Sequence, residues 1–332
     1  MKPTLTACAA VATLAAATAA HAQELTEVSF GTNWLAQAEH GGFYQSVADG
    51  TYAECGLDVT IVPGGPQVNN RALMLAGRLD FHMGGDLLQA FNAVKEEIPV
   101  VSVAATFQKH PQVILAHPGE ADSWDELKDL TLLIGDNGFA SYYQWMIAAH
   151  GFTADQREPY TFNPAPFIAD KGKGMQGYLS SEPYAVEKEA GFKPNVFLIA
   201  DAGYSTYATT IETMQATIDE RPEVVECFVD GSIKGWYNYL LGDSAAADAL
   251  IQSDNPDMTQ DKIEFAKASM MDNGIVMSGD AEELGIGAMT DEKIKDFYDK
   301  MVEAGVIEAG LDYTKAYTLD FTNKKVGMDL HN

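Results

Sequence analysis

Short runs in which apolar and polar residues alternate recur along the first third of the chain, and stretches with helical spacing separate them. Val28 and Phe30 belong to the first run, and Leu57, Val59 and Ile61 alternate in the second. These patterns predict strands over residues 27–33, 57–61, 79–83 and 100–106, with helices over 40–49, 67–77 and 87–95. Strands and helices that alternate at this spacing predict a parallel sheet with right-handed crossovers.

The pattern changes at residues 106–111, where a second group of elements begins. We expect strands over 113–116, 131–134, 160–162 and 196–200, with helices from 123, over 140–150 and over 183–189. Residues 208–213 are interpreted as the chain crossing back, followed by helices over 221–240, 261–272 and 291–304. The sequence predicts an α/β protein of two lobes, each a sheet flanked by helices: 23–110 begin the first lobe, 111–205 form the second, and 206–332 return to the first.

The first 22 residues have the pattern of a cleavable secretory signal. Lys2 precedes a short alanine-rich apolar run that ends in Ala20-His21-Ala22, a small-x-small cleavage site. We therefore expect the mature protein to start near Gln23 and to be exported to the periplasm. No later segment has the length of apolar sequence that spans a bilayer.

Composition and motifs argue against several classes of function. The formal net charge of −27 opposes binding to nucleic acid or to anionic membranes. The chain lacks a Gly-x-Ser-x-Gly elbow, a Walker loop, a Gly-x-Gly-x-x-Gly fingerprint, a His-Glu-x-x-His pair and a Cys-x-x-Cys pair. The common enzyme signatures therefore give no support to catalysis, and we expect neither a metal nor a cofactor.

Two cysteines, Cys55 and Cys227, remain after cleavage of the signal. Their spacing indicates neither a metal site nor a disulfide framework. An oxidising compartment permits a single bridge between them, but we expect two separate buried thiols.

The stretch 33–44 concentrates chemical groups at a predicted strand-to-helix corner. It places Trp34, His40 and Tyr44 beside a glycine pair, Gly41-Gly42, which allows the backbone to approach a ligand. In an open parallel sheet this corner lies at the carboxyl end of the first strand, where ligands bind. We interpret it as part of a binding site; the alternative is that Trp34 and Tyr44 belong to the core.

Glycine loops follow two other predicted strands. Gly64-Gly65 follows the second strand, and a loop over 135–138, which contains Asn137, follows a strand of the second lobe. Cationic groups are scarce, because the chain contains four arginines. A site for sulfonate, nitrate or phosphate usually needs arginine forks or clustered helix N-termini.

Aromatic and acidic residues dominate the remaining candidates. The aromatic side chains offer faces for a flat ring, and Glu182 or Asp86 offers an acceptor for ring donors. This combination favours a neutral or weakly basic heterocycle as the ligand. Each tyrosine has the structural alternative of a half-buried surface residue, and Glu182 before Pro183 has that of a helix cap. The aromatic candidates are Trp34, Tyr44, Tyr142, Tyr143, Tyr204 and Tyr207.

A set of residues along nearly the whole mature chain forms a recognisable series: Trp34 with His40 six positions on, Gly42, Tyr44, Gly50-x-Tyr52-x-x-x-Gly56-Leu57-x-Val59, Gly77-x-x-Asp80-Phe81, Phe107-Gln108 and Glu182-Pro183. The series resembles the thiamine-pyrimidine family. That family comprises periplasmic binding proteins of ABC importers for thiamine pyrimidine precursors, their taurine, sulfonate and nitrate relatives, and the fungal pyrimidine synthases.

The resemblance implies the type II periplasmic binding protein fold, in which two lobes close around a ligand in the cleft between them. It also implies that Trp34 and Tyr44 pack on the ligand ring. In the same way, Glu182 would pair with an amidine-like edge, and Asn33 and His40 would supply hydrogen bonds.

We therefore expect a monomeric periplasmic solute-binding protein that captures a small heteroaromatic solute, such as a thiamine pyrimidine precursor, and delivers it unaltered to an ABC permease and ATPase. One alternative is a receptor for taurine, sulfonate, nitrate or an aromatic carboxylate, helped by helix N-termini at the two glycine loops. Another is a pyrimidine-precursor synthase that uses His40 with pyridoxal phosphate and iron; the synthases' cysteine-rich metal motif is absent. The candidate ligand-binding residues are Asn33, Trp34, His40, Tyr44, Gly64, Gly65, Asp86, Gln108, Asn137, Tyr142, Glu182, Tyr204 and Tyr207.

Overall fold

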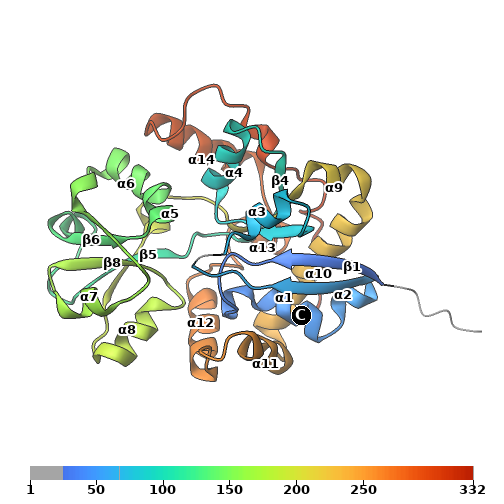
Figure 1. Cartoon of the computed structure of the whole chain (residues 1–332), viewed down its shortest axis with the longest axis horizontal. Coiled ribbons are helices and arrows are strands. Elements are labelled where there is room, and N and C mark those ends of the chain that lie inside the picture. Colours follow the sequence, from blue (N-terminus) through green and yellow to red (C-terminus); the bar gives the residue numbers. More distant parts are fainter. Residues whose placement is uncertain (1–24, 67, 332) are drawn as a thin grey trace, which may run out of the picture.

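Two five-stranded sheets, each flanked by helices, form two lobes that lie side by side (Figure 1). The computed structural model describes residues 25–66 and 68–331, and the predicted signal segment lies outside them. The sheet of the first lobe has the strand order β2-β1-β3-β10-β4, and that of the second lobe has the order β7-β6-β8-β5-β9. The α/β class and the two-lobed architecture predicted from the sequence are therefore confirmed.

The first sheet is mixed rather than parallel. Its strands are β1 (Thr26–Gly31), β2 (Leu57–Val62), β3 (Phe81–Met83), β4 (Val100–Phe107) and β10 (Ala208–Met214). β1 runs parallel to β2 and β3, whereas β10 pairs antiparallel with β3 and β4. The four strands predicted from the first third of the chain share one direction, as expected, and β10, which was interpreted only as the chain crossing back, joins their sheet as an antiparallel strand. This strand enters from the second lobe beside the point where β4 leaves, with Ala208 paired to Phe107, so it runs against its neighbours.

The second sheet contains a strand that the sequence did not reveal. Its strands are β5 (Gln112–Ala116), β6 (Thr131–Ile134), β7 (Arg157–Pro159), β8 (Lys173–Tyr178) and β9 (Asn195–Leu198). The strand predicted over 160–162 lies instead at β7. β8 was missed because two glycines and two polar residues interrupt its apolar pattern. A Cβ at Gly174 would lie 2.6 Å from Leu132 Cδ2, so a glycine there allows close packing between strands.

The helices follow the predicted order. The helix Leu87–Lys95 has the predicted bounds. The helix expected from residue 123 is the short 3-10 helix η2, whose residue Glu126 accepts the backbone N–H groups of the preceding residues Asp122 and Ser123. No helix in the described part of the chain has the length and hydropathy needed to cross a membrane. The helices are η1 (Ala38–His40), α1 (Gly41–Ala48), α2 (Thr51–Glu54), α3 (Asn70–Leu75), α4 (Leu87–Lys95), η2 (Asp125–Asp129), α5 (Asp136–Phe139), α6 (Tyr142–His150), η3 (Ala154–Gln156), α7 (Ala165–Ala169), α8 (Glu182–Ala190), η4 (Ile199–Ala202), α9 (Gln215–Glu220), α10 (Pro222–Leu241), α11 (Ala245–Asp254), α12 (Gln260–Asp272), α13 (Ala281–Leu284), α14 (Asp291–Glu303) and η5 (Tyr313–Ala316).

The glycine pair at the start of α1 serves helix packing. A Cβ at Gly41 would lie 2.0 Å from the Tyr239 ring, and one at Gly42 would lie 2.3 Å from the Trp236 ring. Both rings belong to α10, which therefore packs directly on the backbone of α1. The interpretation that these glycines admit a ligand is wrong, because α10 occupies the space beside them.

A disulfide joins Cys55, after α2, to Cys227 on α10. The two Cα atoms lie 5.8 Å apart, within the range that a disulfide spans. The expectation of two separate thiols is therefore wrong. The cysteines are 172 positions apart in the sequence, which gave no indication that α10 packs beside the end of α2.

Candidate functional site

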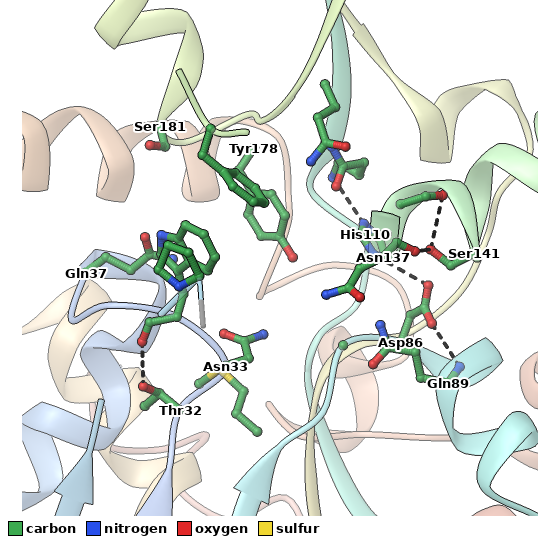
Figure 2. A pocket seen from close by; sticks show the side chains of 18 of the residues that line it. Thr32, Asn33, Gln37, Asp86, Gln89, His110, Asn137, Ser141, Tyr178 and Ser181 are labelled. Atoms are coloured by element: carbon green, nitrogen blue, oxygen red, sulfur yellow. Dashed lines mark hydrogen bonds and ion pairs between the residues drawn. The ribbon is translucent and has the colours of Figure 1, made fainter. Parts of the chain in front are cut away.

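A cavity of about 600 Å³ lies between the two lobes. Its lining comes from segments that follow β1, β2 and β3 in the first lobe and β6, β7 and β8 in the second. Figure 2 shows Asn33 and Gln37 on one side of this cavity and His110 and Asn137 on the other. Carboxyl ends of parallel strands are the usual ligand sites of open α/β sheets, and the volume is typical of small-molecule pockets.

Glu182, the first residue of α8, lies half-buried in the second-lobe wall. Its Oε2 atom accepts a hydrogen bond of 2.6 Å from the backbone N–H of Tyr178. A Cβ at Gly177 would lie 2.6 Å from the Cβ of Glu182, so a glycine at this position leaves room for the acidic side chain. Withdrawal from water raises the pKa of Glu182 to about 7, although the Tyr178 hydrogen bond opposes the rise.

A second carboxyl group, that of Glu39 in η1, lies at the contact between the lobes. Glu39 is buried, and it accepts a hydrogen bond from the hydroxyl of Ser180, which precedes α8 in the second lobe. Burial raises the pKa of Glu39, and its charge in turn raises that of Glu182. Two carboxyl groups with raised pKa values therefore occupy the same interlobe contact.

Aromatic rings from both lobes line the cavity. Trp34 of the first lobe and Phe162 of the second contact each other, with ring centroids 4.8 Å apart. Tyr142 also lines the cavity, and its hydroxyl donates a hydrogen bond of 2.9 Å to Gln176 Oε1. Phe162 has a φ of +61°, which is strained for a bulky side chain. The structure thus holds an exposed aromatic ring at the cavity in a costly backbone conformation.

Arg71 is the one lysine or arginine among the described residues that line the cavity, and its charge is compensated within the first lobe. Its Nη2 atom lies 3.1 Å from Glu212 Oε1. Glu212 is fully buried on β10, and its Oε2 atom lies 3.4 Å from His82 Nδ1. A free arginine fork for an anionic ligand is therefore lacking in the described lining.

Asp86, at the N-terminus of α4, connects the cavity with both segments that cross between the lobes. Its Oδ1 atom accepts the Gln89 backbone N–H at 3.1 Å, and its Oδ2 atom accepts the Tyr204 hydroxyl at 2.8 Å. His110 Nε2 lies 3.6 Å from Oδ2, and burial lowers the pKa of His110 against the opposing effect of the Asp86 charge. This cavity residue thus contacts the outgoing crossing at His110 and the returning crossing at Tyr204.

The structure brings six of the thirteen predicted site residues together around the cavity. The first lobe contributes Asn33, Trp34 and Asp86, and the second contributes Asn137, Tyr142 and Glu182. Each follows a strand whose carboxyl end points toward the cleft. That position is the signal on which the sequence interpretation rested.

Tyr44 and His40 lie in the core of the first lobe and not at the cavity. The Tyr44 hydroxyl donates a hydrogen bond of 2.7 Å to Asp254 Oδ2 on α11. His40 is 1% exposed, and burial lowers its pKa to about 3. The helical turn that begins at residue 38 points both side chains away from the cleft, so their predicted contacts with a ligand are not supported by this geometry.

Gly64, Gly65 and Gln108 have structural roles. A Cβ at Gly64 would lie 2.5 Å from the carbonyl oxygen of Thr32, so this glycine lets the loop after β2 pack on the corner after β1. The loop does not reach the cavity lining at these two positions. Gln108 is buried, and its Nε2 atom donates a hydrogen bond of 2.9 Å to the Ala288 carbonyl. The prediction that these residues line the site is wrong.

Three predicted tyrosines stand outside the cavity lining. Tyr204 is fully buried behind Asp86, to which it donates its hydroxyl hydrogen. The hydroxyl of Tyr207 donates to Asp280 and accepts the Thr290 backbone N–H. Tyr143 donates to the Thr153 carbonyl. The partners of the Tyr204 and Tyr207 hydroxyls are far away in the sequence, and a sequence pattern gives no indication of such partners.

Several cavity residues were not predicted. Gln176 and Tyr178 belong to β8, the strand that was missed, and Phe162 follows β7, whose position was shifted. Gln37 and Gln89 are one helical turn beyond residues that were predicted. Extending the predicted site by one helical turn beyond each strand end would have included Gln37 and Gln89. Gln176, Tyr178 and Phe162 could be placed only with correctly assigned strands. Among the described residues, no group of three or more His, Cys, Asp or Glu residues could hold a metal ion.

Two α/β lobes with a ligand-sized cavity between their sheets define a protein of the type II periplasmic binding protein fold. A model of the family described as "NMT1/THI5 like" matches residues 37–247. The chain belongs to this family.

Among known proteins, the chain is similar to the riboflavin-binding protein RibY of Chloroflexus aurantiacus, with 23% identity over 96% of this chain and 92% of that protein. In fold it resembles the alkanesulfonate-binding protein SsuA of Xanthomonas axonopodis pv. citri bound to MOPS, with a TM-score of 0.63, 12% identity and coverage of 89% and 99% of the two chains. It also resembles the desulfurization enzyme DSZB, with a TM-score of 0.54, 11% identity and coverage of 91% and 99%. The fold is therefore shared by binding proteins and at least one enzyme.

Proposed function

We propose that this protein is the periplasmic solute-binding component of an ABC importer. In this proposal it captures a neutral or weakly basic heteroaromatic solute between its lobes, such as a thiamine pyrimidine precursor or a flavin, and releases it unaltered to a permease and ATPase complex. Family membership, the two-lobed fold and the interlobe cavity support the general assignment. The similarity to a riboflavin-binding protein supports a flat, ring-containing ligand.

The balance of charge in the cavity carries the ligand assignment. Glu182 has a pKa raised to about 7 and lacks a cationic partner among the described residues. Arg71, in contrast, is paired with Glu212. A ligand edge that donates hydrogen bonds, as an amino-substituted ring does, would satisfy the Glu182 carboxylate. An anion would instead meet uncompensated negative charge.

Ring faces in both walls agree with this assignment. Trp34 and Phe162 come from opposite lobes, so a planar solute in contact with both rings binds the closed arrangement better than the open one. A ligand shifts the equilibrium between two conformations only through such differential contacts. Closure would then signal to the transporter that the site is occupied.

Titration calorimetry of protein stripped of copurified ligand tests the proposal. We expect heat and saturation with amino-substituted pyrimidines or flavins, and no binding of nitrate, taurine or alkanesulfonates. Saturable binding confined to the anions would overturn the ligand class in favour of the anion-receptor alternative. Conversion of any probe to a product, followed by mass spectrometry, would overturn the transport assignment.

The synthase alternative loses its chemical basis in this geometry. It required His40 at the site, but His40 lies in the core with both ring nitrogens buried and without a hydrogen-bond partner among the described residues. Mass spectrometry of the His40 peptide after incubation with pyridoxal phosphate and iron gives a direct measurement. We expect the peptide mass to stay unchanged.

A further inference from the structure

Carboxamide side chains are the largest polar class in the cavity, and they fall into two groups. Eight asparagine and glutamine residues line it. Four of them are held by the protein: the side chains of Asn69, Asn70, Gln112 and Gln176 hydrogen-bond to the backbone, with Gln176 also accepting the Tyr142 hydroxyl. These four amides are therefore committed to the structure of the walls.

The other four carboxamides are free. The amide groups of Asn33, Gln37, Gln89 and Asn137 make no hydrogen bond to any described residue. Asn33 and Gln37 belong to the first-lobe corner, Gln89 to α4, and Asn137 to α5 in the second lobe. Each free amide offers one acceptor and two donor hydrogens. The cavity thus presents free, uncharged hydrogen-bonding groups from both lobes.

The free amides extend beyond the Glu182 end of the cavity. Figure 2 shows Tyr178 and Ser181, which flank the Glu182 region, at one end, and Asp86 and Gln89 at the opposite end. A volume of about 600 Å³ corresponds to roughly twenty water-sized groups. A single substituted ring held at Glu182 would leave to solvent both Gln89 at the far end and Asn137, which lies beside His110 between the two ends.

The electrostatics of the far end select against an anionic occupant. Asp86 contributes a carboxylate there, and the Arg71 guanidinium is paired with Glu212. Hydroxyl groups, which both donate and accept, match carboxamides without bringing charge. A phosphate would face Asp86 without a free cation among the described lining residues.

We propose that the part of the cavity with Gln89 and Asn137 is a subsite for an uncharged, polyhydroxylated arm attached to the ligand ring. This inference rests on the proposed function and names the substrate class more closely. The ligand is a ring with a sugar-like or polyol substituent, in preference to the bare ring or its phosphate ester.

Two nested ligand series test the inference by calorimetry on stripped, wild-type protein. The first is cytosine, cytidine and cytidine 5′-monophosphate; the second is lumichrome, riboflavin and flavin mononucleotide. In at least one series we expect the polyhydroxylated member to bind about tenfold or more tightly than the bare ring, as several added neutral hydrogen bonds would give, and the phosphate ester to bind more weakly than it.

Variants of this subsite localise the effect. We expect Gln89→Ala and Asn137→Ala each to weaken binding of the polyhydroxylated probe about threefold to tenfold and to leave the bare ring within about twofold. Gln215→Ala, an exposed helical glutamine on α9, is the matched control and should change neither. Thermal melts check that each variant is folded, and the wild-type series needs no variant.

The outcomes separate this inference from the proposed function. If the bare ring binds as tightly as the polyhydroxylated form, or if the phosphate ester binds most tightly, the subsite is refuted while a heteroaromatic receptor remains. If no ring compound binds in either series, both proposals fail together.

Discussion

The two walls of the cavity differ in how their charges are satisfied. In the first-lobe wall Arg71, Glu212 and His82 form a connected set, and Asp86 accepts hydrogen bonds at both of its oxygen atoms. In the second-lobe wall Glu182 accepts one hydrogen bond from another described residue, the Tyr178 backbone N–H, and its pKa is raised to about 7. The charged groups of the first wall therefore have partners before a ligand binds. Glu182 in the second wall has no cationic partner among the described residues.

This difference indicates where binding energy can arise. Groups whose partners are already in place gain little from a ligand, while a carboxyl group that burial has made unfavourable gains a partner. Phe162 adds to the contrast, because its strained backbone also belongs to the second-lobe wall. We expect substitutions of the charged residues Arg71 and Glu212 in the first wall to change stability, and those of Glu182 and Phe162 in the second wall to change affinity.

The largest effect is expected from Arg71→Met in the first wall. Glu212 is fully buried, so loss of its arginine partner leaves a buried charge poorly compensated and lowers the free energy of unfolding by about 3 kcal/mol. Urea denaturation measures the change. Arg78→Met, at an exposed position, is the control, and the double variant Arg71→Met/Glu212→Gln should recover most of the loss. An unchanged midpoint for the single variant would contradict the contrast.

Glu182→Gln in the second wall should act in the opposite way. We expect affinity for a donor-bearing ring to fall about 10- to 100-fold, because a hydrogen bond to a charged acceptor is lost. Stability of the ligand-free protein at about pH 8 should rise by a few degrees in melting temperature, because the buried charge is gone. Glu189→Gln, exposed on the same helix, is the control. Reduced stability without reduced affinity would assign Glu182 to the structure alone.

The pH dependence should follow the Glu182 pKa of about 7. The stability contributed by this group is present below its ordinary pKa and is lost as the pH rises through about 7, so the ligand-free protein is more stable in mild acid. Binding has the opposite sign, because the ligand needs the ionised form. For a probe that does not titrate, affinity should fall about tenfold per pH unit below 7. Calorimetry across this range checks both wild type and Glu182→Gln, whose profile should be flat.

The smallest effect is expected from Phe162→Asn. Asparagine tolerates a positive φ, so relief of about 1 to 2 kcal/mol of strain offsets the lost contact with Trp34. Stability should change by less than about 1 kcal/mol, while ligand dissociation in stopped-flow fluorescence becomes several-fold faster. Phe162→Tyr, which keeps the ring, serves as the control. A dissociation rate equal to that of wild type would show that Phe162 does not cover the ligand.

The sequence predicted the fold well where one element followed a clear period. Leu87–Lys95 and the two-lobed order rest on regular patterns of apolar residues, and the structure confirms them. β8 and the antiparallel direction of β10 were missed. The first has glycines where strands have apolar residues, and the second depends on the side from which the chain re-enters the sheet.

The candidate site was predicted only where proximity to a strand end was sufficient. Asn33 and Trp34 line the cavity, but Tyr44 and His40, in the same motif, turn into the core. Their orientation depends on contacts with α10 and α11, about two hundred residues later in the chain. The Cys55–Cys227 disulfide depends on the same packing. Such partners come together only when the chain returns to the first lobe.

Because Phe107 at the end of β4 pairs with Ala208 at the start of β10, the chain leaves the first lobe and returns to it at paired positions of two neighbouring strands. The intervening segment, residues 108–207, is therefore connected to the rest of the protein through two adjacent ends. A gene exchange at these positions would replace the half that bears Glu182 and Phe162 and leave the other half intact. Selectivity could then diversify by recombination as well as by point substitution.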